Sequence, residues 1–154
     1  MGTLNHREMV VVQAEPMSLA VVAIETEPAD LAEQIEKSFT VVYAAVSSGK
    51  IQQPGRNVII YRALGSGDID VECGVQVAGS FDGFGQLAYR ETPAGRAATT
   101  THYGPYALLG ETHAALVAWA RSHGLQPTGT FWEVYGDWND DPQQLRVDIF
   151  HQVS

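Results

Sequence analysis

An internal repeat constrains the fold of this chain more than any other feature of its sequence. Residues 28–48 and residues 105–123 each begin with a proline and carry apolar side chains at steps of three and four, which is typical of one face of a helix. Each segment is followed by a glycine, Gly49 or Gly124, of the kind that ends helices. The sequence therefore predicts two helices in equivalent places of two repeats.

Strand-forming segments flank both predicted helices in the same order, with one strand before each helix and two after it. We predict these strands at residues 19–26, 57–63 and 69–78 in the first half, and at 97–103, 131–137 and 145–153 in the second. Equivalent positions lie 74 to 77 residues apart, as Tyr61 and Tyr135 do at 74. Two further strands, at residues 9–14 and 86–91, precede the repeats.

This pattern predicts an α+β fold. Tandem pseudo-two-fold strand–helix–strand–strand repeats would form a sheet with two helices and a cleft between the halves. The length of 154 residues favours a single domain over 1–154, with repeat one at about 9–78 and repeat two at about 86–153.

Charge and cysteine content exclude several classes of protein. The net charge of −9 argues against binding nucleic acid or docking on an anionic membrane. A single cysteine, Cys73, excludes an intrachain disulfide and a multi-cysteine zinc site, and the five histidines lack zinc-ligand spacing. We therefore expect no metal and no cofactor. The absence of a signal-like start favours a cytoplasmic protein, and the oligomeric state is left open.

One carboxylate stands out in the strand predicted at residues 131–137. Alternation places Phe131, Glu133 and Tyr135 on one face, with apolar residues on the other, so a strand covered on both sides would bury Glu133. The repeat supplies a comparison, because the position equivalent to Glu133 holds Ile59 and the fold does not need a carboxylate there. The alternatives are exposure to solvent or a structural pair with one of four arginines: Arg62, Arg90, Arg96 or Arg146.

A carboxylate surrounded by aromatic rings suits an organic cation, which needs a charge partner and flat apolar walls. The candidate ligand-binding residues are Glu133, Tyr135, Phe131, Tyr61, Trp119, Tyr106, Phe39 and Tyr43. The alternative for the aromatic residues is a place in the core, which is common at helical spacing.

Several short motifs resemble a known family. They are His102-Tyr-Gly-Pro-Tyr-Ala-Leu-Leu, Trp119, Glu133-Val-Tyr, Asp141-Pro and Leu145-Arg-Val-Asp-Ile. In order and spacing they are similar to the GyrI-like small-molecule-binding domain, which forms the effector-binding half of BmrR- and Rob-type regulators and also occurs alone. The resemblance implies a cleft between the halves for bulky, apolar, often cationic compounds, with Glu133 at its centre. No helix-turn-helix precedes the first predicted strand, so we expect a stand-alone member that does not bind DNA by itself.

The resemblance leaves three functions open. The first is binding of drugs or toxins, for sequestration or sensing. The second is hydrolysis of strained cyclopropanoid electrophiles, with Glu133 and Tyr135 as catalytic residues, and the third is a gyrase-inhibitor-like interaction with another protein. If Glu133 is buried without a fixed cationic partner, replacing it by isoleucine is expected to stabilise the fold.

Overall fold

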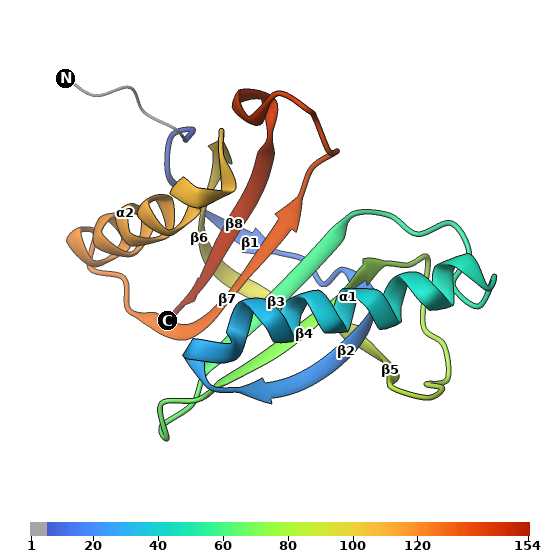
Figure 1. Cartoon of the computed structure of the whole chain (residues 1–154). Helices are drawn as coiled ribbons and strands as arrows, with labels where there is room; N and C mark the ends of the chain where they lie inside the picture. Colours follow the sequence, from blue (N-terminus) through green and yellow to red (C-terminus); the bar gives the residue numbers. More distant parts are fainter. Residues whose placement is uncertain (1–5) are drawn as a thin grey trace. The chain divides into compact units, whose positions relative to one another are not determined.

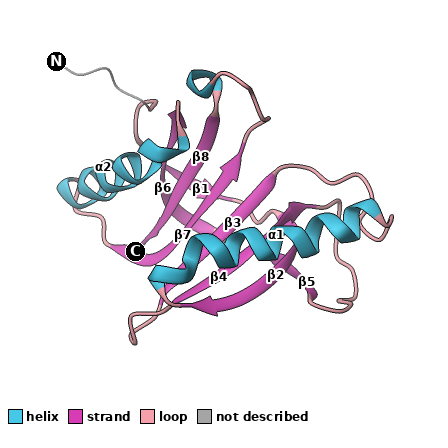
Figure 2. Cartoon of the chain, viewed as in Figure 1, coloured by secondary structure: helices cyan, strands magenta, loops and turns pink. Residues whose placement is uncertain are grey.

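The computed structural model describes residues 6–154, whose contacts divide the chain into two compact units. We call them the α1 unit, Glu15–Pro93, and the α2 unit, which comprises the described residues 6–14 together with Ala94–Ser154. Each unit combines antiparallel strands with one long helix (Figures 1 and 2), so the fold class is α+β, as the sequence predicts.

In the α1 unit, helix α1 packs on a four-stranded antiparallel sheet. Its elements are β2 (Ser18–Thr26), η1 (Pro28–Asp30), α1 (Leu31–Ser47), β3 (Asn57–Ala63), β4 (Ile69–Gln76) and β5 (Leu87–Glu91). The strands lie in the order β3-β4-β2-β5. Gly74 of β4 is required by close packing, because a Cβ there would lie 1.9 Å from the carbonyl oxygen of Ala20 in β2.

In the α2 unit, helix α2 packs on strands β6, β8 and β7. The elements are β1 (Val10–Ala14), β6 (Gly95–Tyr103), η2 (Tyr106–Leu108), α2 (Leu109–Ser122), β7 (Pro127–Tyr135), η3 (Pro142–Gln144) and β8 (Arg146–Val153). The strands lie in the order β1-β6-β8-β7, all antiparallel. The core between sheet and helix contains Ala98, Leu109, Leu116, Ala120, Val147, Ile149 and Val153.

The two units repeat the same order of elements and the same register. Tyr61 lies opposite Val71 in β4, and Tyr135 lies opposite Val147 in β8. Two details differ from the prediction. Strand β7 begins at Pro127, four residues early, and ends at Tyr135. The helical segments lie 78 residues apart, one residue more than the two prolines do. The reason is that Pro28 is the first residue of η1, whereas Pro105 is the N-cap residue before η2.

The first strand of each predicted repeat pairs in a way that the repeat pattern does not reveal. Strand β1 lies at the start of the first repeat, yet it pairs with β6 of the second. Strand β5 lies at the start of the second repeat, yet it pairs with β2 of the first. The compact units therefore differ in their bounds from the sequence repeats.

Both helices end as their glycines predict. Gly49 and Gly124 adopt positive φ values of 79° and 74° directly after the capping residues. In each case the next amide donates to a carbonyl of the last turn, Lys50 to Ala45 at 3.0 Å and Leu125 to Ala120 at 2.9 Å. This Schellman arrangement satisfies carbonyl groups that a helix end otherwise leaves open.

Candidate functional site

Glu133 lies on the face of β7 that is turned toward helix α2. It is opposite Ile149 of β8, a core residue under the helix, and its side chain is buried, with 4% of its surface exposed. The Tyr135 hydroxyl donates to Oε1 at 2.8 Å. Glu133 is thus a buried, hydrogen-bonded carboxyl group of the α2 unit.

The partner of the second carboxylate oxygen comes from the helix. His113 of α2 places Nε2 2.8 Å from Oε2 of Glu133, and its Nδ1 lies 2.8 Å from Nε2 of His151 in β8. His151 is itself buried and stacks on Phe131, with ring centroids 4.7 Å apart and an angle of 10° between the planes. Three elements thus join in one hydrogen-bonded cluster, His151–His113–Glu133–Tyr135.

The protons of this cluster can be assigned from the donors that each group has. Burial, together with the neighbouring His113, lowers the pKa of His151 to about 3, so this ring is neutral at physiological pH. The Nε2–H of His113 donates to the Glu133 carboxylate, and Nδ1 of His113 shares a hydrogen bond with Nε2 of His151.

A second histidine network positions the start of α2 and thereby Tyr106. His102 is fully buried at the end of β6, where Nδ1 lies 2.7 Å from the Thr112 hydroxyl and Nε2 lies 3.1 Å from the carbonyl oxygen of Pro105. Gly104 between them has a φ of 110°, which favours glycine. The His-Tyr-Gly-Pro-Tyr motif therefore fixes the turn from β6 into η2.

The predicted aromatic residues of the α2 unit separate into two groups. Tyr135 bonds Glu133, and two further rings contact the groups that bond it: Phe131 packs against His113 at 5.3 Å between centroids, and Tyr106 contacts Tyr135 edge-on at 5.4 Å. Partial burial raises the pKa of the Tyr106 hydroxyl, so it is neutral. Trp119 instead packs on the core beside His123, with ring centroids 4.4 Å apart.

The other predicted aromatic residues lie in the α1 unit. Tyr61 is buried in β3. Phe39 packs against the core under α1, and Tyr43 is exposed with its hydroxyl bonded to Asn57. A ligand-binding role for these three residues stays a prediction.

Sequence reasoning missed His113 and His151, although a signal for each was present. His151 continues the alternation of Val147, Ile149 and Val153, a buried and otherwise apolar face of β8. His113 follows Leu109 by four residues and precedes Leu116 by three, which places it on the inner face of α2. A polar side chain at such a position needs a partner, and here the two histidines and Glu133 supply it.

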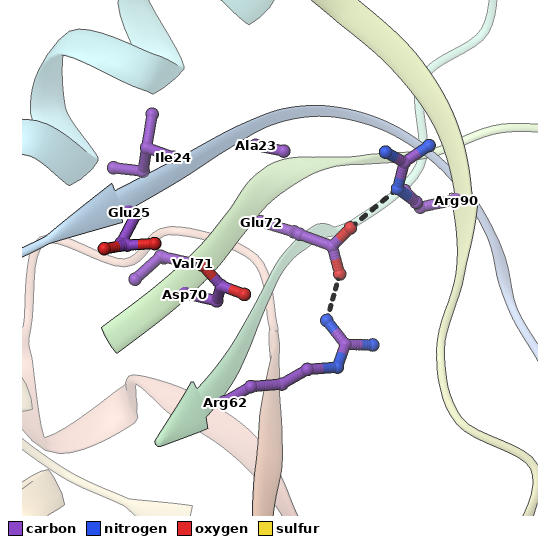
Figure 3. Close-up of a pocket in the computed structure, with 8 residues that line it drawn as sticks. All are labelled: Ala23, Ile24, Glu25, Arg62, Asp70, Val71, Glu72 and Arg90. Atoms are coloured by element: carbon purple, nitrogen blue, oxygen red, sulfur yellow. Dashed lines mark hydrogen bonds and ion pairs between the residues drawn. The ribbon is translucent and has the colours of Figure 1, made fainter. Parts of the chain in front are cut away.

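Three of the four arginines considered as partners for Glu133 bind other carboxylates. Arg62 and Arg90 contact the two oxygens of buried Glu72 at 2.5 and 2.9 Å, and Arg146 bonds Asp148 (Figure 3 for Glu72). A cavity of about 320 Å³ adjoins Glu72, and its lining consists of Ala23, Ile24, Glu25, Arg62, Asp70, Val71, Glu72 and Arg90. Two arginines neutralise Glu72, and none of the lining residues is aromatic.

Within residues 6–154, no group of three or more histidine, cysteine or acidic side chains is arranged to hold a metal ion. None of the helices that the structure describes is long and apolar enough to span a membrane.

Comparison with known proteins identifies the family. The model of the GyrI-like small molecule binding domain matches residues 8–154. This chain belongs to the GyrI-like family. A comparison with curated proteins gives no significant match.

Solved structures carry the same GyrI-like fold at low sequence identity. EcmrR in a DNA complex has a TM-score of 0.76 and 16% identity over 97% of this chain, which spans 58% of the EcmrR chain. The separate C-terminal domain of EcmrR has a TM-score of 0.69 and 17% identity, covering 96% of this chain and 97% of the domain. SAV2435, solved with tetraphenylphosphonium, has a TM-score of 0.71 and 11% identity, covering 96% of this chain and 94% of its own.

The lowered pKa of His151 predicts a dependence of stability on pH. An ordinary histidine pKa is 6.5, so between about pH 6.5 and 3 the unfolded chain binds a proton that the folded chain does not. The contribution of neutral His151 to the free energy of unfolding is therefore complete above this window, and it is lost as the pH falls through the window. Relative to His151→Val, the free energy of unfolding should fall by up to about 1.4 kcal/mol per pH unit. Urea unfolding at pH 7, 6 and 5 measures this slope, and parallel curves would contradict it.

Proposed function

We propose that this GyrI-like chain binds bulky apolar organic cations at Glu133, between the carboxylate and the rings of Phe131, Tyr135 and Tyr106. The observation that carries the proposal is the repeat itself. Glu133 lies opposite Ile149 and Ile59 lies opposite Cys73 in the same register, so an equivalent strand folds with an isoleucine where this one buries a carboxylate. A buried charge that the fold does not require is typical of a binding site.

The local chemistry supports a cation in particular. A tyrosine hydroxyl and an imidazole bond the Glu133 oxygens, and hydrogen bonds of this kind stabilise the charged form of a carboxyl group. The surrounding rings offer apolar surface and the negative faces that attract cations. The relative SAV2435 was solved with tetraphenylphosphonium, a bulky cation of this class.

The experiment that tests the proposal compares two ligands of similar size and shape. Methyltriphenylphosphonium is a cation, whereas triphenylphosphine oxide replaces its methyl group by oxygen and is neutral. Calorimetric titration of the wild-type chain should give about tenfold or greater preference for the cation, because the carboxylate contributes only to that ligand. Equal affinity for the two ligands would contradict the proposal.

Binding accounts for this geometry better than the hydrolase alternative does. Both ring nitrogens of His113 are engaged, one by Glu133 and one by His151, which leaves neither directed at a water molecule. Such a cluster is suited to holding a charge in place. No observation favours the gyrase-inhibitor-like alternative.

A further inference from the structure

The loop between β7 and η3 carries a large aromatic side chain on the surface. Trp138 is 71% exposed, more than any other large hydrophobic residue in the part of the chain that the structure describes. Leaving an indole in water forgoes the burial that usually holds such a ring in the core. Its ring is therefore accessible to a ligand.

Trp138 is the outer end of a row of aromatic rings that leads to the buried carboxylate. Its ring centroid lies 6.4 Å from that of Tyr106, and Tyr106 lies 5.4 Å from Tyr135. The Tyr135 hydroxyl in turn donates to Glu133. Exposure decreases along this row, from Trp138 through half-exposed Tyr106 to Glu133.

The loop holds the indole in place and surrounds it with negative charge. The indole N–H of Trp138 donates to Oδ1 of Asp140 at 3.2 Å, and the Asp141 carboxylate accepts from the amide of Gln143 at 3.0 Å. Residues 137–141 contain three aspartates and no lysine or arginine. The nearest basic residue in the sequence, Arg146, is bonded to Asp148. An aromatic face in an acidic setting attracts organic cations.

We propose that Trp138 and Tyr106 form a peripheral subsite for aromatic organic cations, at the outer end of the row that leads to Glu133. We call it the Trp138 platform. The inference rests on the proposed function for its ligand class, but it assigns a separate place and a separate role. The platform captures the cation at the surface, and Glu133 holds it in the buried site.

Titration of methyltriphenylphosphonium into matched variants tests the platform. Trp138→Ala should weaken binding by about threefold to fivefold, in line with an exposed cation–π contact, whereas Trp138→Phe should retain most of the affinity. Asp140→Asn keeps an acceptor for the indole and removes one charge, so it should slow association more at low salt than at high salt. Because the side chain is exposed, thermal unfolding should not change.

The same measurements separate failure of the platform from failure of the proposed function. In Glu133→Gln, the cation should still quench tryptophan fluorescence at high concentration, and adding Trp138→Ala should abolish that quenching. Unchanged affinity and association rate in Trp138→Ala, while Glu133→Gln still loses cation binding, would overturn the platform alone. If Trp138→Ala changes the sedimentation behaviour of the chain but not its cation affinity, the patch is a self-association surface and the proposal is wrong.

Discussion

Glu133→Gln is expected to weaken binding of methyltriphenylphosphonium by about tenfold to a hundredfold, and binding of triphenylphosphine oxide by less than about threefold. The substitution keeps the shape of the side chain and removes its charge. Only the cation loses an attraction, and that attraction is strong because Glu133 is buried. Calorimetric titration of both ligands into both proteins isolates the effect of charge.

The α1 unit offers a matched control for this experiment. Glu72 is also a buried carboxylate on a central strand, but Arg62 and Arg90 bind both its oxygens. Glu72→Gln removes the same charge from the chain and should leave the preference for the cation unchanged. If the two variants lose cation affinity equally, the effect comes from net charge and not from a site at Glu133. Equal losses for the cation and the neutral ligand in Glu133→Gln would mean that the carboxylate is structural.

The second large effect concerns stability. The sequence predicts that Glu133→Ile stabilises the fold only if this carboxylate is buried without a fixed cationic partner. The structure places His113 against the carboxylate, so the single substitution leaves its Nε2–H without an acceptor in a partly buried place. We expect Glu133→Ile to lower the free energy of unfolding by about 1–3 kcal/mol.

Replacing the whole cluster by its counterparts from the first repeat should reverse this loss. The counterparts are Ile35 for His113, Ile59 for Glu133 and Val75 for His151. Buried polar groups replaced together by apolar residues of similar size are often neutral or stabilising. Tyr135 then has an isoleucine beside it, as Tyr61 has in β3. We expect the triple variant to equal or exceed the wild type by about 1–4 kcal/mol and to lose its preference for cations.

Urea unfolding of wild type, Glu133→Ile and the triple variant at pH 7 measures this reversal. A triple variant less stable than Glu133→Ile would show that the cluster stabilises the α2 unit, and the argument that Glu133 is kept for function would lose its support. The His151 substitution also removes the group with the lowered pKa, so the triple variant should lose less stability than wild type on acidification.

Much of the local structure could be predicted from the sequence. The steps of three and four, the terminal glycines and the alternating strands determine the helices and strands of both units, because these patterns reflect local geometry. The repeat also aligned Glu133 with Ile59, and the strand registers confirm that alignment. Glu133 could be singled out because one copy of the repeat serves as a control for the other.

The contacts between elements could not be predicted in this way. The pairing of β1 with β6 and of β5 with β2 depends on which strands meet, and no pattern within those strands specifies a neighbour. Trp138 is likewise an ordinary loop residue in the sequence, and only the fold places it beside Tyr106.

The polar cluster shows most clearly what the sequence determined and what the tertiary structure determined. The sequence by itself determined that Glu133 lies on the covered face of a strand and, through periodicity, that His113 and His151 also occupy inner positions. Only the tertiary structure decided that the three meet, because this needs β7 beside β8 and a particular rotation of α2 above them. Hydrogen bonds require atoms within about 3 Å, and residues 20 and 38 positions apart reach that distance only through packing.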